Sequence, residues 1–585
     1  MLKQASRRIF TGSKLRFRLP RTSSNPLHRR FFPERLRRFT TSIHARVAAA
    51  GVGIVVSAFG AYAAYEVQRD PLSEGKLVEV TLPPIPPPTV YKHPYDDSPM
   101  IWKLAFKIQR IAYFACLFAP CVITGLLAKI TDDPDLRASW IKLLVRTIEL
   151  GGSSCMKFGQ WLSMRPDVIA GDVIQALTQL RQNAPTHSFQ QTRKIIESSL
   201  GKRLEEIFEE ISEKPVASGT IAQVHRARLR PEYALKSTDG KLIQDVAVKV
   251  QHPGVIAQTY CDIDVMFQGA GLLFAVPFSK TEFSNALQRQ INFEWEAYNL
   301  WKFKQNFKEE ISKGSIRFPE VSKELLAPEV LVESWINGHT ISELFDGKNP
   351  NTKNVKGPKN SKKKTEKDLM EQRSKFSKLK AYKDKMGYWA KTIFQTNAKM
   401  FLKDNFVHGD LHAGNVMVSE DHPESVVVID AGCTCQLKEE VRPKFEKFVN
   451  AMCNGDSKVI TDSIIGFNQK QTKKENISKF RKSINETVKR FVASPGQSPD
   501  GEPVKIGAFL TAVLKEIQKH GLMLRSDVAM SLVTLGLSEG LIKQLDPKFD
   551  CVGGTMSYML GLRLSEMITC HSPASTHLPN ILSQW

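Results

Sequence analysis

The pattern of hydrophobic and polar positions contains two long stretches without a charged residue. The first is residues 47–65, which at about 1.5 Å per helical residue would nearly span a bilayer core of roughly 30 Å. We predict a single membrane span there, and the alternative is a hydrophobic part of a leader sequence. The second is residues 111–128, which Pro120 interrupts, so a buried or membrane-lying helix is favoured over a second span.

Shorter periodic segments predict the folded body. Residues 246–251 form a β-branched run typical of a strand, residues 293–300 have a helical pattern, and an amphipathic helix is predicted to begin near Val441. The chain length allows one domain of about 430 residues after the leader and spacer. We predict an α+β fold of two lobes, with a small β-rich lobe followed by a helical lobe.

Three polar side chains flank a predicted β-hairpin that consists of residues 416–418 and 425–429. Asp410 and Asn415 precede this hairpin, and Asp430 follows it directly. In kinase-type sites, a first Asp orients or takes the proton of the attacking hydroxyl, while an Asn and a second Asp hold the metal at the phosphates. A D-x-x-x-x-N spacing is common by chance, but the hairpin and the D-x-G favour function. The spacing therefore predicts ATP and Mg²⁺ as cofactors, Asp410 as catalytic, and Asn415 and Asp430 as metal ligands.

An upstream lysine completes this prediction. Lys249 lies in the run V-A-V-K, in the position of a kinase lysine that contacts the α and β phosphates and needs a helical glutamate as its partner. We predict Glu296 as that partner, with Glu294 as the rival. The alternative interpretation is that Lys249 is only a solvated lysine on a strand.

The expected glycine-rich phosphate loop is replaced by a turn of small residues. The residues assigned to nucleotide binding in this turn are Ala217, Ser218, Gly219 and Thr220. Residues 330–334 are predicted to form the hinge, which places Glu333 in the nucleotide site. No A-P-E segment follows Asp430, so a platform for protein substrates is not evident.

These motifs resemble those of the UbiB or aarF-domain-containing (ADCK) atypical kinases. The resemblance runs from about Ser139 to about Tyr558 and includes K-F-G-Q at residues 157–160 and A-Q-V-H at residues 222–225. It implies a protein-kinase-like fold with an N-terminal helical extension. It also implies that the chain is a mitochondrial atypical kinase or ATPase that supports coenzyme Q (ubiquinone) or related lipid metabolism.

The same resemblance assigns a role to the K-F-G-Q motif. It implies that Lys157 and Gln160 belong to an extension that packs over the nucleotide site and blocks protein substrates. The family commonly has an acidic E-x-D motif facing this lysine, whereas this chain has Gln290 and Asn292. The anchoring of Lys157 is therefore expected to be looser. Gly219, where relatives are commonly alanine-rich, is expected to let the backbone approach phosphates more closely.

Charge and cysteine content narrow the location. Residues 1–46 hold eleven Arg and two Lys against Glu34 alone, a composition typical of a mitochondrial transit peptide. Residues 346–386 hold fourteen basic and five acidic side chains, so these two segments account for almost all of the net charge of +22. A nucleic-acid partner is therefore not expected. The nine cysteines show no C-x-x-C pair, so disulfides are not implied.

Two alternatives to the leading function remain open from the sequence. One is a small-molecule phosphotransferase like the aminoglycoside and choline kinases, which share H-G-D-x-H-x-G-N; the other is a nucleotide-binding scaffold. The expected partners are ATP, the mitochondrial inner membrane with quinone-like lipids, and a membrane protein complex. The predicted segments are a transit peptide (1–46), a membrane span (47–65), a Pro-rich spacer (66–100), a helical extension (101–200), an N-lobe (201–335), a basic disordered insertion (336–385) and a helical C-lobe (386–570).

Overall fold

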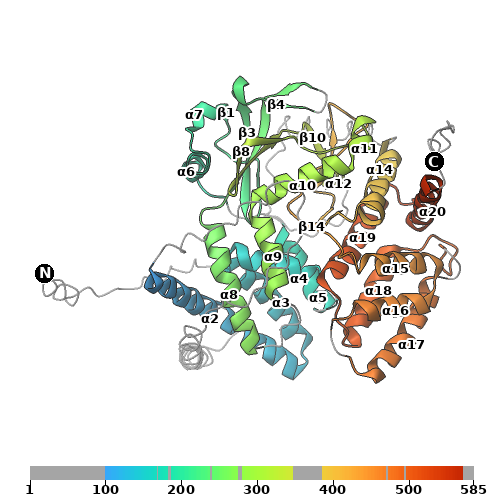
Figure 1. Ribbon diagram of the computed structural model, residues 1–585. Coiled ribbons are helices and arrows are strands. Elements are labelled where there is room, and N and C mark those ends of the chain that lie inside the picture. The colour runs from blue at the N-terminus through green and yellow to red at the C-terminus, as the bar shows by residue number, and fades with distance from the viewer. Residues whose placement is uncertain are drawn as a thin grey trace, which may run out of the picture. The chain divides into compact units, whose positions relative to one another are not determined.

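The computed structural model describes residues 99–570. The gaps within this range are residues 166, 168, 182–185, 238–239, 274–279, 347–384, 470–471 and 493–495. The predicted leader and membrane span, nearly all of the spacer, and most of the basic insertion therefore lie outside the described residues. The described part has the predicted α+β architecture, with helices before a first sheet and a largely helical second lobe (Figure 1).

The N-lobe is built on a six-stranded sheet in the order β1-β3-β6-β9-β8, with β2 paired to β3. Its strands are β1 (Phe208–Ile211), β2 (Ala217–Ser218), β3 (Ala222–Leu229), β6 (Asp245–Gln251), β8 (Val321–Ala327) and β9 (Val330–Ser334). The predicted strand at residues 246–251 is thus confirmed as β6. The segment predicted as a hinge is itself the buried strand β9, so the connection to the second lobe begins after Ser334.

The alternation of side chains along β6 separates a core face from a functional face. Val246, Val248 and Val250 are completely buried against Ile196 of α6 and its neighbours. Lys249 therefore points to the opposite face, where α10 packs. The helices of this lobe are α6 (Phe189–Leu200), α7 (Leu204–Ile207), α10 (Phe293–Asn306) and α11 (Lys308–Ser312), and the short elements are η3 (Pro231–Tyr233), β4 (Leu235–Lys236) and β5 (Leu242–Ile243).

Capping residues determine where two of these helices begin. Ser188 accepts from the backbone N–H of Gln191, and the Gln191 side chain reaches back to the backbone of Ser188, which forms a capping box at α6. Asn292 accepts from the backbone N–H of Glu294 at 2.8 Å and so begins α10. Glu296 consequently falls in the first turn of α10.

The second lobe begins with a four-stranded sheet in the order β10-β12-β13-β7. Its strands are β7 (Ile316–Arg317), β10 (Gly338–Thr340), β12 (Val416–Ser419) and β13 (Val426–Val428). The antiparallel pairing of β12 and β13 confirms the predicted hairpin. β7 runs parallel to β13 although it precedes β8 of the N-lobe sheet, so the range predicted as N-lobe also contributes to the second sheet. A separate pair is formed by β11 (Val407–His408) and β14 (Thr434–Cys435).

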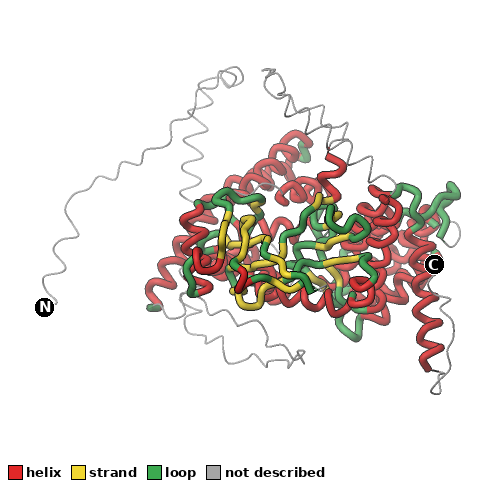
Figure 2. The backbone as a smooth tube through the Cα atoms, turned by 90° about the horizontal axis from the view of Figure 1, so that it is seen from above, coloured by secondary structure: helices red, strands yellow, loops and turns green. Residues whose placement is uncertain are grey.

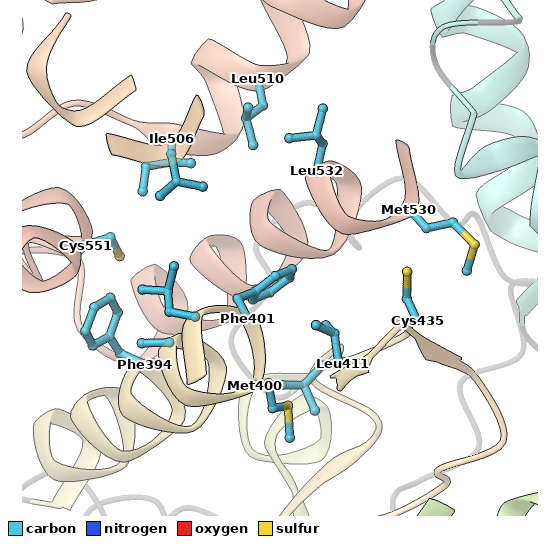
Figure 3. Packing of buried hydrophobic residues seen from close by; sticks show 14 of the residues in the cluster. Phe394, Met400, Phe401, Leu411, Cys435, Ile506, Leu510, Met530, Leu532 and Cys551 are labelled. Carbon is cyan, nitrogen blue, oxygen red and sulfur yellow. The ribbon is translucent and has the colours of Figure 1, made fainter. Parts of the chain in front are cut away.

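Helices pack around a continuous apolar core in the second lobe. They are α12 (Ile341–Asp346), α14 (Met386–Ala398), the π-helix η6 (Lys399–Lys403), α15 (Arg442–Asn454), α16 (Ser457–Phe467), α17 (Lys474–Phe491), α18 (Ile506–Lys519), α19 (Ser526–Leu545) and α20 (Cys551–Cys570). Figure 3 shows Phe401 and Leu411 facing Leu532 and Ile506 within this core. The helix predicted near Val441 is confirmed as α15.

The N-terminal helices join two helices from the middle of the chain. They are α2 (Met100–Thr131), α3 (Pro134–Leu150), α4 (Ser153–Ser163), α5 (Gly171–Leu177) and η2 (Thr178–Arg181), and they pack with α8 (Val255–Leu273) and α9 (Lys280–Ile291). Arg110 donates two hydrogen bonds to the buried carboxylate of Asp262, at 2.7 and 2.8 Å. Figure 2 shows strands lying between groups of helices in the described part.

Two described helices are long and apolar enough to cross a membrane. α19 is largely buried in the C-lobe core, whereas α2 is largely exposed and contains residues 111–128. A helix over residues 111–128 is confirmed, and Pro120 lies inside it. The alternative of a buried helix is wrong for most of its length, because only Phe114, Cys121 and Ala128 of α2 are buried, whereas the alternative of a membrane-lying helix stays a prediction.

Candidate functional site

The upper part of the candidate site is one lysine held between two glutamates. Lys249 Nζ on β6 donates to Glu296 Oε1 at 2.5 Å and lies 3.5 Å from Glu333 Oε1. The side chains of Lys249, Glu296 and Glu333 are only 13%, 6% and 6% exposed. The predicted pair of Lys249 and Glu296 is therefore present, and Glu294 as its rival is wrong.

The charges around Lys249 do not balance. Burial raises the pKa of Glu296 to about 7; the charge of Lys249 opposes this rise, and the charge of Asp430 adds to it. Burial also raises the pKa of Glu333. Burial alone would lower the pKa of Lys249, but the charges of Glu296, Glu333 and Asp430 outweigh it and hold that pKa well above its usual value. The charges of three carboxylates thus act on one buried ammonium group, and such an excess of negative charge suits the binding of a further cation.

Asp430 is held in a backbone conformation that L-amino acids rarely adopt. Its φ of 56° is left-handed, and Asp is one of the few residue types that tolerate this region. The backbone on both sides is fixed: Ile429 N–H donates to Asn415 O at 3.0 Å, and the Asn299 amide donates to Ala431 O at 2.8 Å. Burial would raise the pKa of Asp430, but Lys249 and Lys157 lower it below its usual value. The carboxylate is therefore ionised and fixed in place.

The loop from Asp410 to Asn415 is closed by its own side chains. The Asn415 amide donates to Asp410 O at 3.0 Å, while His408 Nδ1 accepts from Asp410 N–H at 3.2 Å. His412 Nδ1 accepts from Gly414 N–H at 2.9 Å. Both histidines therefore shape the loop.

Asn415 and Asp430 fit a hard cation such as Mg²⁺. Mg²⁺ is usually held by one or two carboxylates or amides together with substrate phosphates, rather than by a cage of protein ligands. The hydrogen bond to Asp410 uses the amide nitrogen of Asn415, so its oxygen is the atom that a cation would take. Among the described residues, no group of three or more His, Cys, Asp or Glu is placed to hold a metal without such additional ligands.

The turn of small residues lies at the edge of the same sheet. Ala217 and Ser218 form β2, and Gly219 N–H donates to Ala222 O at 2.8 Å across the turn that contains Thr220. Gly219 does not have a positive φ, and an added Cβ would meet Ala222 O at an ordinary 3.8 Å. The turn therefore does not require glycine.

Helix α4 brings Lys157 towards the lower part of the site. The charge of Lys157 contributes to the lowered pKa of Asp430, so Lys157 lies near enough to act on this carboxylate electrostatically. Gln160 is engaged elsewhere, because its amide donates to Leu180 O at 3.1 Å. Asn292 caps α10, and the Gln290 amide lies 3.8 Å from Cys433 Sγ. In the described part of the chain, neither Gln290 nor Asn292, which stand where relatives have the acidic motif, has a hydrogen bond to Lys157.

Cys433 and Cys435 follow Asp430 but are poor candidates for redox chemistry. Burial raises the pKa of each thiol to about 12, so little thiolate exists at neutral pH.

Two contributors to the site were missed in the sequence. Thr534 of α19 donates to Gly409 O at 3.1 Å, and nothing in the local sequence indicates a contact with a residue more than a hundred positions away. Asn299 holds the backbone beside Asp430 and lies three residues after Glu296 on α10. That helical spacing was a signal that could have identified it.

The comparisons with known proteins agree with this geometry. Residues 179–464 match the model of the ABC1 atypical kinase-like domain. The chain is 25% identical over 533 residues to "Probable serine/threonine-protein kinase abkC" of Dictyostelium discoideum, covering 77% of this chain and 68% of that protein. It is 24% identical over 516 residues to "ABC1 family protein YPL109C, mitochondrial" of Saccharomyces cerevisiae, covering 76% and 72%.

A bacterial relative extends the comparison. The chain is 25% identical over 427 residues to "Probable protein kinase UbiB" of Shewanella woodyi, covering 70% of this chain and 67% of that protein. The matched domain contains Lys249, Glu296, Asp410, Asn415 and Asp430. The predicted kinase-like fold and family resemblance are confirmed: the chain has an ABC1 atypical kinase-like domain and is a homologue of the UbiB and ABC1 family proteins.

Proposed function

We propose that this protein is an ATP- and Mg²⁺-dependent atypical kinase or ATPase. The observation that carries the proposal is the buried Lys249–Glu296 ion pair, with the ionised carboxylate of Asp430 close enough to shift the pKa of both partners. Burying three carboxylates around one lysine is unfavourable, and a protein that served only as a scaffold would not need this arrangement. Kinase-type phosphoryl transfer does need one, because the lysine neutralises the phosphates.

In this proposal each side chain has a separate task. Lys249 pairs with the α and β phosphates, and Glu296 keeps its ammonium group in place. Asn415 and Asp430 hold Mg²⁺, which neutralises the charge that develops on the phosphates. Asp410 receives or orients the proton of the acceptor hydroxyl or water.

Glu333 is suited to the nucleotide itself. Its Oε1 faces Lys249, and its Oε2 is buried with no hydrogen-bond partner among the described residues. A buried acceptor without a donor costs about 1–3 kcal/mol, so a donor on the ligand would relieve it. We infer that an N–H group of the nucleotide fills this position.

The cellular role and location belong to the same proposal. The name of the yeast relative includes the word mitochondrial, and the predicted leader and membrane span favour the inner membrane. The relation to UbiB proteins supports a role in coenzyme Q or related lipid metabolism. The exposed apolar surface of α2 suits a protein that works beside lipids.

Turnover of ATP by the purified full chain tests the proposal. We expect Mg²⁺-dependent release or transfer of the γ-phosphate that increases when membranes containing quinone-like lipids are added. Substitution Asp410→Asn should abolish turnover while ATP still binds. Absence of both ATP binding and turnover in the wild-type protein would contradict the proposed function.

A further inference from the structure

A chain of hydrogen-bonded imidazoles ends on the turn of small residues. His252 Nε2 lies 3.0 Å from Gly219 O, and His252 Nδ1 lies 2.8 Å from His187 Nδ1. His187 Nε2 lies 2.9 Å from the hydroxyl of Thr192 on α6. We refer to Thr192, His187 and His252 as the imidazole chain.

The direction of every hydrogen bond in the imidazole chain follows from the carbonyl of Gly219, at which the chain ends. A carbonyl can only accept, so His252 must carry its proton on Nε2, and its Nδ1 must accept. His187 must then donate from Nδ1, which leaves its Nε2 to accept from the Thr192 hydroxyl. This assignment requires neutral rings.

The surroundings keep the rings neutral. Burial lowers the pKa of His187 to about 4, with the like charges of His252 and His225 contributing, and burial also lowers the pKa of His252 and of His225. In the described part of the chain, neither His187 nor His252 has a carboxylate within 4.0 Å. One set of tautomers therefore satisfies the whole chain at neutral pH.

The A-Q-V-H motif anchors the imidazole chain to β3. The completely buried Gln223 accepts from His187 N–H at 3.0 Å and donates to His187 O at 3.2 Å, so its amide clamps the His187 backbone. The adjacent His225 is also completely buried, and its Nδ1 lies 2.7 Å from Ser212 O. The motif thus fixes the position from which His187 reaches His252.

His252 contacts the turn twice. Its backbone N–H donates to Ile221 O at 2.8 Å, and its ring binds Gly219 O two residues earlier. A carbonyl oxygen turned towards a phosphate repels it, whereas a carbonyl tied to an imidazole N–H is kept engaged elsewhere. Because a histidine ring can bind at both nitrogens, it can link the turn to a distant anchor.

We propose that His252, held by His187 and the A-Q-V-H motif, is a positioning residue that keeps the Gly219 carbonyl away from the phosphates of the bound nucleotide. This inference rests on the proposed function, because it assumes that the turn receives ATP. It predicts that the ε-nitrogen of His252 matters for affinity more than the δ-nitrogen.

Two substitutions separate the two nitrogens in the full chain. His252→Gln places an amide N–H near the ε position and can still bind Gly219 O, whereas His252→Asn reaches only the δ position. We expect the Kd for Mg²⁺-ATP to rise about tenfold in His252→Asn, the effect of one lost hydrogen bond, and less than about threefold in His252→Gln. The kcat should change little in both variants, and His422→Asn on the β12–β13 turn is the matched control.

A thermal unfolding curve accompanies each Kd. Should His252→Asn fail to fold, His252→Leu replaces it, since this change also removes the ε N–H that binds Gly219 O, and its Kd should rise about tenfold. Equal shifts in the glutamine and asparagine variants, or no shift in His252→Leu, would overturn the inference alone. If the wild-type protein binds no ATP, the proposed function fails first and the inference with it.

Discussion

Lys249 Nζ and Glu296 Oε1 lie 2.5 Å apart, and both side chains are almost completely buried. β6 supplies the lysine and α10 supplies the glutamate, so the pair also joins the sheet to its helix. A second carboxylate, Glu333, lies 3.5 Å from the same ammonium group. The lysine is therefore oriented by two partners before any ligand arrives.

Substitution Glu296→Gln should impair the site without destroying it. The change removes one charge from the pair, while Glu333 still faces Lys249. We expect ATP turnover to fall by about tenfold or more, the equivalent of about 1.5–3 kcal/mol for a hydrogen bond to a charged group. Glu294→Gln in the same helical turn is the control, and turnover measured side by side in the two variants checks the prediction. An equal loss in both would contradict the role of the pair.

The pKa of Glu296 gives a stability effect of defined sign. This pKa is raised from an ordinary 4.5 to about 7 in the folded protein, so between these values the folded state holds a proton that the unfolded state has lost. Stability should therefore fall as pH rises from about 4.5 to about 7, by about 1–3 kcal/mol for this group. Thermal unfolding of the ligand-free protein across this window should show the slope, and Glu296→Gln should lack this part of it. If the stability of the wild-type protein rose with pH across this window relative to that of Glu296→Gln, the assignment would be contradicted.

Local sequence patterns were sufficient for the parts of the site that lie within single elements. The run of β-branched residues at 246–251 predicted β6, because alternation with period 2 determines which face Lys249 occupies. The hairpin of β12 and β13 followed from two short strands around a turn. Glu296 was favoured over Glu294 from the sequence pattern, and Asn292 caps the helix α10 that carries both residues.

Contacts between distant segments could not be predicted in this way. β7 enters the second sheet beside β13, although more than a hundred residues separate them. α8 and α9 interrupt the N-lobe and pack with the N-terminal helices, where buried Asp262 of α8 pairs with Arg110 of α2. His187, which precedes α6, meets His252, which follows β6, only when α6 packs against β6. Each of these contacts depends on the tertiary fold, which the periodicity and spacing of residues in the sequence do not determine.

Substitution Lys157→Ala should strengthen the binding of divalent cations. The positive charge of Lys157 contributes to the lowered pKa of Asp430, and the same charge repels a cation at that carboxylate. We expect the Kd for Mg²⁺ in the presence of ATP to fall about threefold, because a weak long-range charge is lost. Because Gln290 and Asn292 replace the acidic motif, the change in ATPase activity should be smaller than in relatives that keep it. Lys142→Ala, at an exposed position on α3, is the control; weaker Mg²⁺ binding in Lys157→Ala would contradict this account.

Binding of ATP to the wild-type chain and to Asp430→Asn, each with Mg²⁺ and with chelator, tests the central claim most directly. Asp430 is ionised, is held at a left-handed φ of 56°, and interacts electrostatically with Lys249, so it is the carboxylate best suited to join metal and phosphate. Asp421→Asn, at an exposed turn of the same hairpin, is the matched control. The account predicts that wild-type and control affinities fall at least tenfold in chelator, and that Asp430→Asn binds ATP weakly whether or not Mg²⁺ is present. Tight ATP binding that neither chelator nor Asp430→Asn changes would contradict the assigned site.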